Sequence, residues 1–347
     1  MLNASCLDKN SAFLIEDYTD RKYFSGVDLA EGFVFLYKTP VYFTDARYFY
    51  AAKNKIAAAD FLLVLYTGLE SIKSIADSFG ITRLGVDYNK TSVAFYNRLK
   101  DLGFELFDCS ESVAESRSVK TETEIGYIKK ACEIAQTAFY NALKTVKVGM
   151  TETELKNVIE KACFSLGAEK MSFDTIVAFG ENSAVPHHET DQTVLQPDSP
   201  VLVDMGCVYK GYCSDLTRTV FFGKPPKKFI MAYQAVLRAN EETEAEFKAG
   251  DKISLLHNNA VRILQEYGFD KYFTHSLGHG VGLEIHESPA VNGKNDSVLK
   301  AGTVFTVEPG VYFDGEFGIR IEDTVIATEK GIKRFFTDGK ELVIIKQ

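Results

Sequence analysis

The chain has 347 residues, which is more than one hydrophobic core usually serves, so we expect two domains. Hydrophobic residues make up 46% and charged residues 25% of the chain, as in ordinary globular proteins, and the net charge is −9. This negative charge argues against nucleic acid as a partner, because the sequence offers no basic surface to bind phosphates.

The first 18 residues lack a basic segment followed by a long apolar run, so we expect no signal peptide. The chain also lacks an uninterrupted apolar stretch long enough to span a bilayer, so we expect no membrane association. The cysteines are scattered without CxxC spacing, which indicates reduced thiols in a cytoplasmic protein. They are Cys6, Cys109, Cys132, Cys163, Cys207 and Cys213.

The first part of the chain alternates short apolar runs with a helical segment, which indicates an α/β domain. The expected elements are two strands within 32–49 around a turn at Lys38–Pro40, a strand at 61–66, a helix at 71–80 ended by Gly80, and strands near 84 and 105. The charged stretch at 115–124 changes the composition, and we place the domain boundary there. The expected domains are therefore 1–118 and 119–347.

Two long helices of the second domain begin with capping boxes. Thr121 with Glu124, and Thr151 with Glu154, have the T-x-x-E spacing in which side chain and backbone bond reciprocally. Apolar residues then recur at helical spacing. Further expected elements are helices at about 226–248 and 252–267 and strands at 200–206, 217–223, 303–313 and 319–327.

The second domain repeats itself. The segment Gly149–Gly167 has a counterpart 101 residues later, and the run from Val194 to Asp204 has one 104 residues later that ends at Glu308. Each half therefore supplies a helix followed by a strand that ends in a carboxylate. This shared order favours a duplicated half-domain.

Two hairpins bring acidic residues together. A turn at Tyr209–Lys210 would place Asp204 opposite Asp215, and a turn centred on Gly315 would place Glu308 opposite Glu322. Four close carboxylates repel one another, and two divalent cations would balance their charge. The alternative, solvated acids on exposed strands, explains one pair but not two matched pairs in a repeated frame.

Histidines cluster close to these hairpins. His275, His279 and His286 fall within 12 residues amid glycines, which permit close backbone approach, and His187 and His188 precede the first hairpin. A solitary histidine is more often structural, but this clustering favours a functional site. We assign no role to His188 or to His257, which lies in the middle of a predicted helix.

Four segments resemble, in order and spacing, the motifs of the pita-bread metallopeptidases, the family of creatinase, aminopeptidase P and prolidase. They are VDMGCVYKGYCSDLTRT, HSLGHGVGLEIHESP, VEPGVY and GIRIEDTV. YFSGVD and FTDARYF also resemble the creatinase-type N-terminal domain. The resemblance implies an α+β protein with a creatinase-like α/β domain and a C-terminal pita-bread fold that contains an internal pseudo-two-fold repeat.

The resemblance also implies a two-metal site. Asp204 would chelate one metal ion, Asp215 and Glu322 would bridge both, and His279 and Glu308 would complete the other. This oxygen-rich set with one imidazole suits Mn²⁺, and Co²⁺ or Zn²⁺ also fits. The family implies manganese or cobalt most often.

The implied activity is hydrolysis of the peptide bond between an N-terminal residue and proline, with metal-activated water as the nucleophile. Glu308 would shuttle a proton, and His187 and His286 would contact the substrate. His275 would support the site from outside the ligand set. Arg320, two residues before Glu322 on the same strand, would orient a ligand carboxylate or hold a substrate carboxylate.

Dipeptidase (prolidase) and aminopeptidase P remain alternatives. Some dipeptidases of this family carry an arginine shortly after the HExP motif, whereas Ala290 and Val291 follow Pro289 here. A catalytically inactive pita-bread binding protein and a metal-free creatinase-like hydrolase are further alternatives, although the intact ligand set argues against both. The family implies a homodimer that acts on short peptides with proline at the second position.

Overall fold

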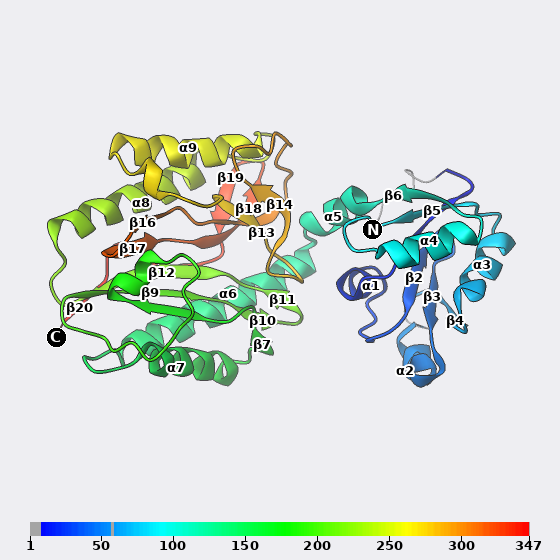
Figure 1. Ribbon diagram of the computed structural model, residues 1–347, viewed down its shortest axis with the longest axis horizontal. Coiled ribbons are helices and arrows are strands. Elements are labelled where there is room, and N and C mark those ends of the chain that lie inside the picture. The colour runs from blue at the N-terminus through cyan, green and yellow to red at the C-terminus, as the bar shows by residue number, and fades with distance from the viewer. Residues whose placement is uncertain (1–7, 57–58, 347) are drawn as a thin grey trace. The chain divides into compact units, whose positions relative to one another are not determined.

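The computed structural model describes residues 8–56 and 59–346, and the chain divides into two compact units, 1–117 and 118–347. Cys6 and the first seven positions of the segment that we examined for a signal peptide lie outside the described residues. Figure 1 labels the helices and strands of both units. Each unit has hydrophobic clusters of its own.

The first unit is built on a mixed six-stranded sheet with the order β4-β3-β2-β1-β5-β6. β1 pairs antiparallel with β2 and parallel with β5. Its elements are β1 (Ser11–Ile15), α1 (Tyr18–Ser25), β2 (Phe33–Leu36), β3 (Val41–Thr44), α2 (Ala46–Ile56), β4 (Leu62–Leu65), α3 (Leu69–Ser78), β5 (Arg83–Val86), α4 (Val93–Asp101), β6 (Glu105–Asp108) and α5 (Ser110–Ser118). The five predicted strand positions of this unit and the helix that precedes Gly80 are confirmed.

Within the segment 32–49, the second strand is short and a helix follows it directly. β3 ends at Thr44, because the carboxylate of Asp45 accepts a hydrogen bond from the backbone N–H of Arg47 at 2.8 Å, and its carbonyl accepts one from Phe49 at 3.0 Å. These bonds satisfy the first donors of α2 and start the helix. On β1, Leu14 and its neighbours Phe13 and Ile15 belong to different hydrophobic clusters, so side chains fill both faces of the sheet.

The second unit places strands between two pairs of helices, α6 with α7 and α8 with α9 (Figure 1). Its sheets have the orders β11-β10-β7, β20-β12-β9-β8, β14-β13-β15-β18-β19 and β16-β17. Its elements are α6 (Glu122–Leu143), α7 (Glu152–Ser165), β7 (Lys170–Met171), β8 (Ile176–Phe179), η2 (Gly180–Ala184), β9 (Ser199–Met205), β10 (Cys207–Tyr209), β11 (Tyr212–Cys213), β12 (Leu216–Phe222), α8 (Lys227–Glu246), α9 (Ile253–Glu266), η3 (Asp270–Tyr272), β13 (Gly278–Gly280), β14 (Glu287–Val291), β15 (Val304–Val307), β16 (Gly310–Phe313), β17 (Phe317–Arg320), β18 (Asp323–Thr328), β19 (Gly331–Arg334) and β20 (Ile344–Ile345).

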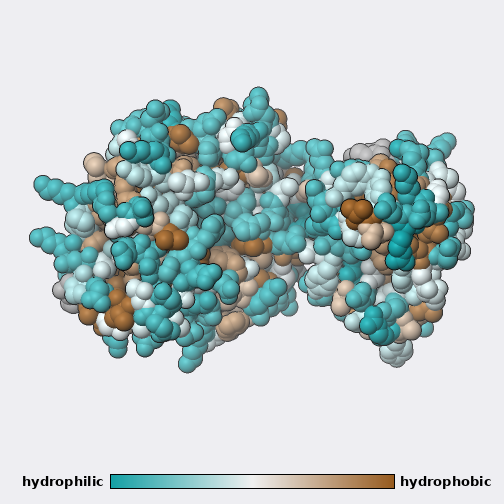
Figure 2. Space-filling model, in the orientation of Figure 1, coloured by the Kyte–Doolittle hydropathy of each residue, from teal (hydrophilic) through white to brown (hydrophobic). Residues whose placement is uncertain are grey.

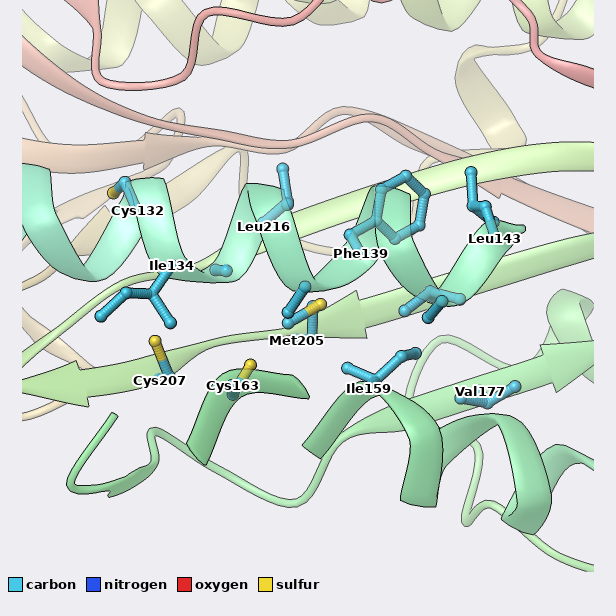
Figure 3. Packing of buried hydrophobic residues seen from close by; sticks show 14 of the residues in the cluster. Cys132, Ile134, Phe139, Leu143, Ile159, Cys163, Val177, Met205, Cys207 and Leu216 are labelled. Atoms are coloured by element: carbon cyan, nitrogen blue, oxygen red, sulfur yellow. The ribbon is translucent and has the colours of Figure 1, made fainter. Parts of the chain in front are cut away.

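Two hydrophobic cores hold these layers together. In the first, Phe139 of α6 and Ile159 of α7 belong to one buried cluster with Met205 of β9 and Leu216 of β12 (Figure 3). The second joins α8 and α9 to β12 and to the strands from β14 to β18. Each helix pair therefore covers the strands with its apolar stripe, as the helical periodicity predicted.

Both capping boxes are present, with reciprocal bonds between Thr121 and Glu124 and between Thr151 and Glu154. The predicted repeat is also confirmed. Thr151, before α7, forms an isolated antiparallel bridge with Val194, and its counterpart Lys252, before α9, forms the same bridge with Val298. The repeat therefore preserves backbone pairing as well as sequence order.

The register of the first hairpin differs from the prediction. Asp204 pairs with Thr217, not with Asp215, because the turn lies at Lys210–Gly211, one position later than expected. Both turn residues have positive φ, 51° and 82°, as a type I′ hairpin turn requires. The one-residue shift moves the pairing by two, so the two aspartates become diagonal neighbours on the same face.

The second hairpin has the predicted register. Val307 pairs with Asp323 and Gly310 with Arg320, so Glu308 and Glu322 occupy facing positions between these pairs. The two predicted continuous strands are, however, interrupted at these acids. Neither glutamate lies in a named strand, because the backbone N–H of Glu308 donates to Leu277 at 2.8 Å and that of Glu322 donates to Thr217 at 3.1 Å.

In the part of the chain that the structure describes, no helix combines the length and apolar character needed to cross a membrane. The face shown in Figure 2 carries scattered apolar side chains among predominantly hydrophilic ones.

Candidate metal centre

A cavity of about 550 Å³ opens in the second unit where the two repeat halves meet. The nine residues that we singled out as ligands or catalytic groups all line it. They are His187, Asp204, Asp215, His275, His279, His286, Glu308, Arg320 and Glu322. Residues far apart in sequence thus converge on one site, and the apolar side chains of Phe173, Ile176 and Ile285 form part of its wall.

Local irregularities of the backbone direct the acidic side chains into the cavity. Asp215 follows β11 and precedes β12, and Glu308 and Glu322 each lie between two strands. His279 is on the short strand β13, where the pairing with β14 shifts register between His279 and Gly280. Such breaks and bulges reorient side chains next to functional sites.

The donor atoms lie at distances suited to a shared cation. Nε2 of His279 is 3.5 Å from Oδ2 of Asp215 and 3.6 Å from Oε1 of Glu308. Atoms of Asp215, His279 and Glu322 all lie within 4.8 Å of one another. These separations are too long for strong hydrogen bonds, but they suit ligands that surround a common ion.

The electrostatics of the site also fit a metal. Burial, together with the neighbouring carboxylates, holds the pKa of Asp215 and of Glu308 well above their ordinary values and raises the pKa of Glu322 to about 8. Burial lowers the pKa of His279 to about 4, so its imidazole is neutral and can act as a ligand. Oδ1 of Asp204 is buried without a hydrogen-bond partner. Divalent cations would offset the unfavourable free energy of burying these repelling carboxylates and the unpartnered oxygen.

Arg320 is buried beside the acids, with 3% of its surface exposed. Its Nη2 donates to Oδ2 of Asp204 at 2.7 Å, and its Nη1 donates to the hydroxyl of Tyr312 at 2.7 Å. Its Nε donates to Oγ1 of Thr217 at 3.1 Å. Of the two roles expected for Arg320, these contacts favour the orientation of a ligand carboxylate.

The histidines differ in their surroundings. Nδ1 of His275 contacts the carbonyl of Ser276 at 2.7 Å, and its Nε2 contacts the hydroxyl of Tyr312 at 3.0 Å, so both ring nitrogens are engaged. Burial lowers the pKa of His275 to about 4. The ring of His286 lies 4.3 Å from that of His279 in an edge-on arrangement, and His187 lines another part of the cavity.

Sequence reasoning missed two residues that organise the site, Thr217 and Tyr312. Oγ1 of Thr217 donates to Oε2 of Glu322 at 2.6 Å, and Tyr312 connects Arg320 with His275. Thr217 lies two residues after Asp215, so strand periodicity could have placed it on the same face. For Tyr312, apart from its place in the VEPGVY motif, the sequence offered no signal.

A second group of possible ligands is structural. Glu152, His188 and Asp191 lie close together, but the Glu152 carboxylate accepts hydrogen bonds from the backbone N–H groups of Phe179 and Asp191. It also contacts Nε2 of His188 at 2.7 Å. His188 and Glu152 therefore hold a loop together. His257 stacks on Phe273 and does not line the cavity.

Comparisons with known proteins define the class. Residues 126–329, more than half of the chain, match metallopeptidase family M24, and residues 8–119 match the creatinase/prolidase N-terminal domain. The chain therefore belongs to metallopeptidase family M24, whose members use divalent metal ions, and it has the two-domain architecture that the motifs predicted.

Three individual proteins are similar to the chain over most or a large part of its length. An Xaa-Pro dipeptidase from Pyrococcus horikoshii is 36% identical over 97% of this chain and 96% of its own. The crystal structure of an X-Pro aminopeptidase from Thermotoga maritima MSB8 has a TM-score of 0.89 and 33% identity, and the match covers 99% of both chains. An uncharacterized peptidase from Staphylococcus saprophyticus is 43% identical over 65% of this chain and 64% of its own length.

Proposed function

We propose that the chain is a two-metal peptidase that cleaves the bond between an N-terminal residue and proline. The convergence of four carboxylates and one neutral imidazole on a single cavity carries this proposal. Asp204, Asp215, His279, Glu308 and Glu322 would hold the metal ions. When bound, the ions would polarise the scissile carbonyl and lower the pKa of a water molecule, which makes that water a better nucleophile at neutral pH.

The other residues of the site would bind the substrate, transfer protons or hold the ligands in position. Glu308 would accept a proton from the attacking water and pass it to the leaving nitrogen. His187 and His286 would donate hydrogen bonds to the developing charge on the substrate. Arg320 would keep the Asp204 carboxylate in place, and His275 would act on the site through Tyr312.

The apolar wall supports a preference for proline. A prolyl peptide bond has no N–H group and carries a rigid ring, so it needs a shaped apolar surface rather than a backbone acceptor. Phe173, Ile176 and Ile285 supply such a surface. The substrates would be short peptides with proline at the second position.

The length of the substrate separates two versions of this function. Among the lining residues, Arg320 is the one arginine, and Asp204, Tyr312, Thr217 and the carbonyl of Pro186 already engage its N–H groups. This arrangement leaves little capacity to bind a dipeptide's carboxylate and favours an aminopeptidase. The similarity to the Pyrococcus dipeptidase favours the other version. The experiment therefore includes one substrate for the aminopeptidase and one for the dipeptidase.

We further propose Mn²⁺ as the native metal, with Co²⁺ and Zn²⁺ as substitutes, because the ligand set is rich in carboxylate oxygen. A homodimer in the cytoplasm would be the working form. The five cysteines among the described residues are free thiols, as a reducing compartment would keep them.

The decisive experiment compares the hydrolysis of Ala-Pro with that of Ala-Pro-Ala by the Mn²⁺-loaded protein. Cleavage of the dipeptide alone would establish a dipeptidase, and preference for the tripeptide would establish an aminopeptidase. If two ions bind and neither peptide is cut, the preference for proline is wrong. If no ion binds, the two-metal site is wrong. Size-exclusion chromatography with light scattering tests the dimer.

A further inference from the structure

Arg218 lies on β12 behind the metal centre, on the face of the strand that points away from the cavity. Neighbouring side chains of a strand point to opposite faces. Thr217 accordingly reaches the Glu322 carboxylate, whereas the guanidinium of Arg218 is buried on the other side with 3% exposure. Arg218 is thus a buried charge close to the centre that the proposed chemistry does not use.

The guanidinium of Arg218 donates hydrogen bonds to backbone carbonyls at and beside Glu322. Its Nη1 donates to the carbonyl of Glu322 at 2.6 Å and to the carbonyl of Thr217 at 3.0 Å. The carbonyl of Thr217 also accepts the N–H of Glu322 at 3.1 Å. Both peptide groups that flank the Glu322 Cα are therefore held, at a point where the strand ladder is interrupted.

Asp338, in the C-terminal segment, orients the guanidinium. Its Oδ2 accepts from Nε of Arg218 at 2.9 Å and its Oδ1 accepts from Nη2 at 3.1 Å, which is a bidentate pair with both side chains 4% exposed. Asp323 accepts a further bond from Nη2 at 2.7 Å. Tyr140 of α6 donates to Oδ2 of Asp338 at 2.9 Å and further restrains the carboxylate.

We infer that Arg218 and Asp338 are positioning residues for the metal centre, which tie the C-terminal segment to the backbone of Glu322. This inference rests on the proposed function, because it takes Glu322 to be a metal ligand. Without the guanidinium, the carbonyl of Glu322 loses its buried donor, and one of the bonds that hold the backbone beneath the carboxylate is lost. The loss of an outer partner of a metal ligand typically costs about 10- to 100-fold in metal affinity.

Arg334 provides a matched control. It belongs to the same ionic cluster, with Nη2 3.1 Å from Oδ1 of Asp338 and Nε 3.1 Å from Oδ2 of Asp323. Its other described bond goes to the carbonyl of Asp338. These contacts end one residue short of Glu322. Replacement of Arg334 therefore perturbs the ionic cluster and its stability without releasing the backbone of Glu322.

The test titrates Mn²⁺ into the metal-free, full-length wild type and the variants R218M, R218K, D338N and R334M. Free Mn²⁺ is measured by electron paramagnetic resonance, and the melting temperature of each metal-free protein is recorded. We expect R218M, R218K and D338N to bind at least one ion about 10- to 100-fold more weakly than wild type. R334M should stay within about twofold despite a lower melting temperature, since its contacts do not reach Glu322.

R218K covers the case in which R218M fails to fold. Lysine keeps the charge, but its ammonium cannot reproduce the planar fork that bridges two carbonyls and two carboxylates. Wild-type affinity in both R218K and D338N, or an equal loss of affinity in R334M, would overturn the inference. Failure of the wild type to bind two ions would instead overturn the proposed function.

Discussion

At the scale of single residues, hydroxyl and guanidinium donors stabilise the acids of the site. Four carboxylates share one cavity, and burial together with their mutual repulsion raises the pKa of Asp215, Glu308 and Glu322. Thr217 and Arg320 counter this by bonding Glu322 and Asp204, respectively. The arrangement resembles other metal sites in which outer partners fix the direction of the ligands.

Replacement of Thr217 by valine should reduce activity without altering the shape of the strand. The variant T217V removes the donor to Glu322 and the acceptor of Arg320 Nε, so we expect kcat/KM to fall by about 10- to 100-fold. T219V is the control, because Thr219 is equally buried and contacts only backbone atoms of Arg320. T219V should lose about 1–3 kcal/mol of stability and keep its activity. Equal activity of the two variants would contradict the assigned role of Thr217.

The metal-free protein should become less stable as the pH rises from about 6.5 to about 8. Glu322 has a folded pKa of about 8 against an ordinary value of 4.5, so the folded state binds more protons in this window and loses stability as they leave. His275 and His279, whose pKa values are lowered to about 4, oppose folding only below their ordinary value of 6.5.

Melting temperatures recorded across this pH range check the prediction. Saturating Mn²⁺ should raise the melting temperature more at about pH 8 than at about pH 6.5, since bound cations stabilise the ionised carboxylates. The metal-free variant E322Q should show a weaker dependence on pH than metal-free wild type. An identical dependence in E322Q would rule out Glu322 as its source.

At the scale of elements, the two hairpins carry the four acidic residues that we propose as ligands, and their turns determine which residues face one another. The turn at Lys210–Gly211 makes Thr217 the partner of Asp204, and the register around Gly315 keeps Glu308 and Glu322 face to face. Because a hairpin's register follows from its turn, the conformation of two surface residues decides the geometry of a buried site.

The variant G211A should destabilise the protein by about 1–2 kcal/mol, because φ at Gly211 is 82° and a Cβ is disfavoured there. K210N creates the Asn-Gly pair that type I′ turns prefer, and it should stay within about 0.5 kcal/mol of wild type or exceed it. Urea unfolding followed by circular dichroism measures both. A G211A variant as stable as K210N would mean that this turn does not determine the pairing.

At the scale of the whole molecule, two units with separate cores share one chain, and the described residues that line the candidate metal centre all lie in the second. That unit is itself a repeat, in which α7 and α9 enter through equivalent bridges. Duplication explains why the proposed ligands come from both halves. Each half supplies a hairpin with one pair of acids, and the cavity forms where the two hairpins meet.

Calorimetry should therefore resolve two unfolding transitions, of which Mn²⁺ shifts only one. An ion at a hundredfold excess over its dissociation constant stabilises the binding unit by about 2.7 kcal/mol. None of the residues that the structure describes in the first unit lines the cavity, so the transition of that unit should stay in place. D215N is the control, since it should lose the shift while retaining both transitions. A single transition that moves as a whole would show that the two units unfold together.

The sequence alone was sufficient to predict those features whose signal is local or repeated along the chain. Both capping boxes, the strand positions of the first unit, the duplicated halves and the register of the second hairpin depend on neighbouring residues or on a fixed offset, and the structure contains all of them. The nine residues of the candidate site were also identified in advance, because their motifs lie in short segments of recognisable spacing.

Tertiary structure alone decided the register of the first hairpin and the contacts between residues far apart in the sequence. In the first hairpin, neighbouring turn positions compete, and the left-handed conformation at Lys210 and Gly211 settled a register that the acidic pattern had placed wrongly. The contact of Arg218 with Asp338 joins residues 120 positions apart. No local pattern encodes such a pair, because its partners meet only when packing brings the C-terminal segment against β12 and buries both charges together.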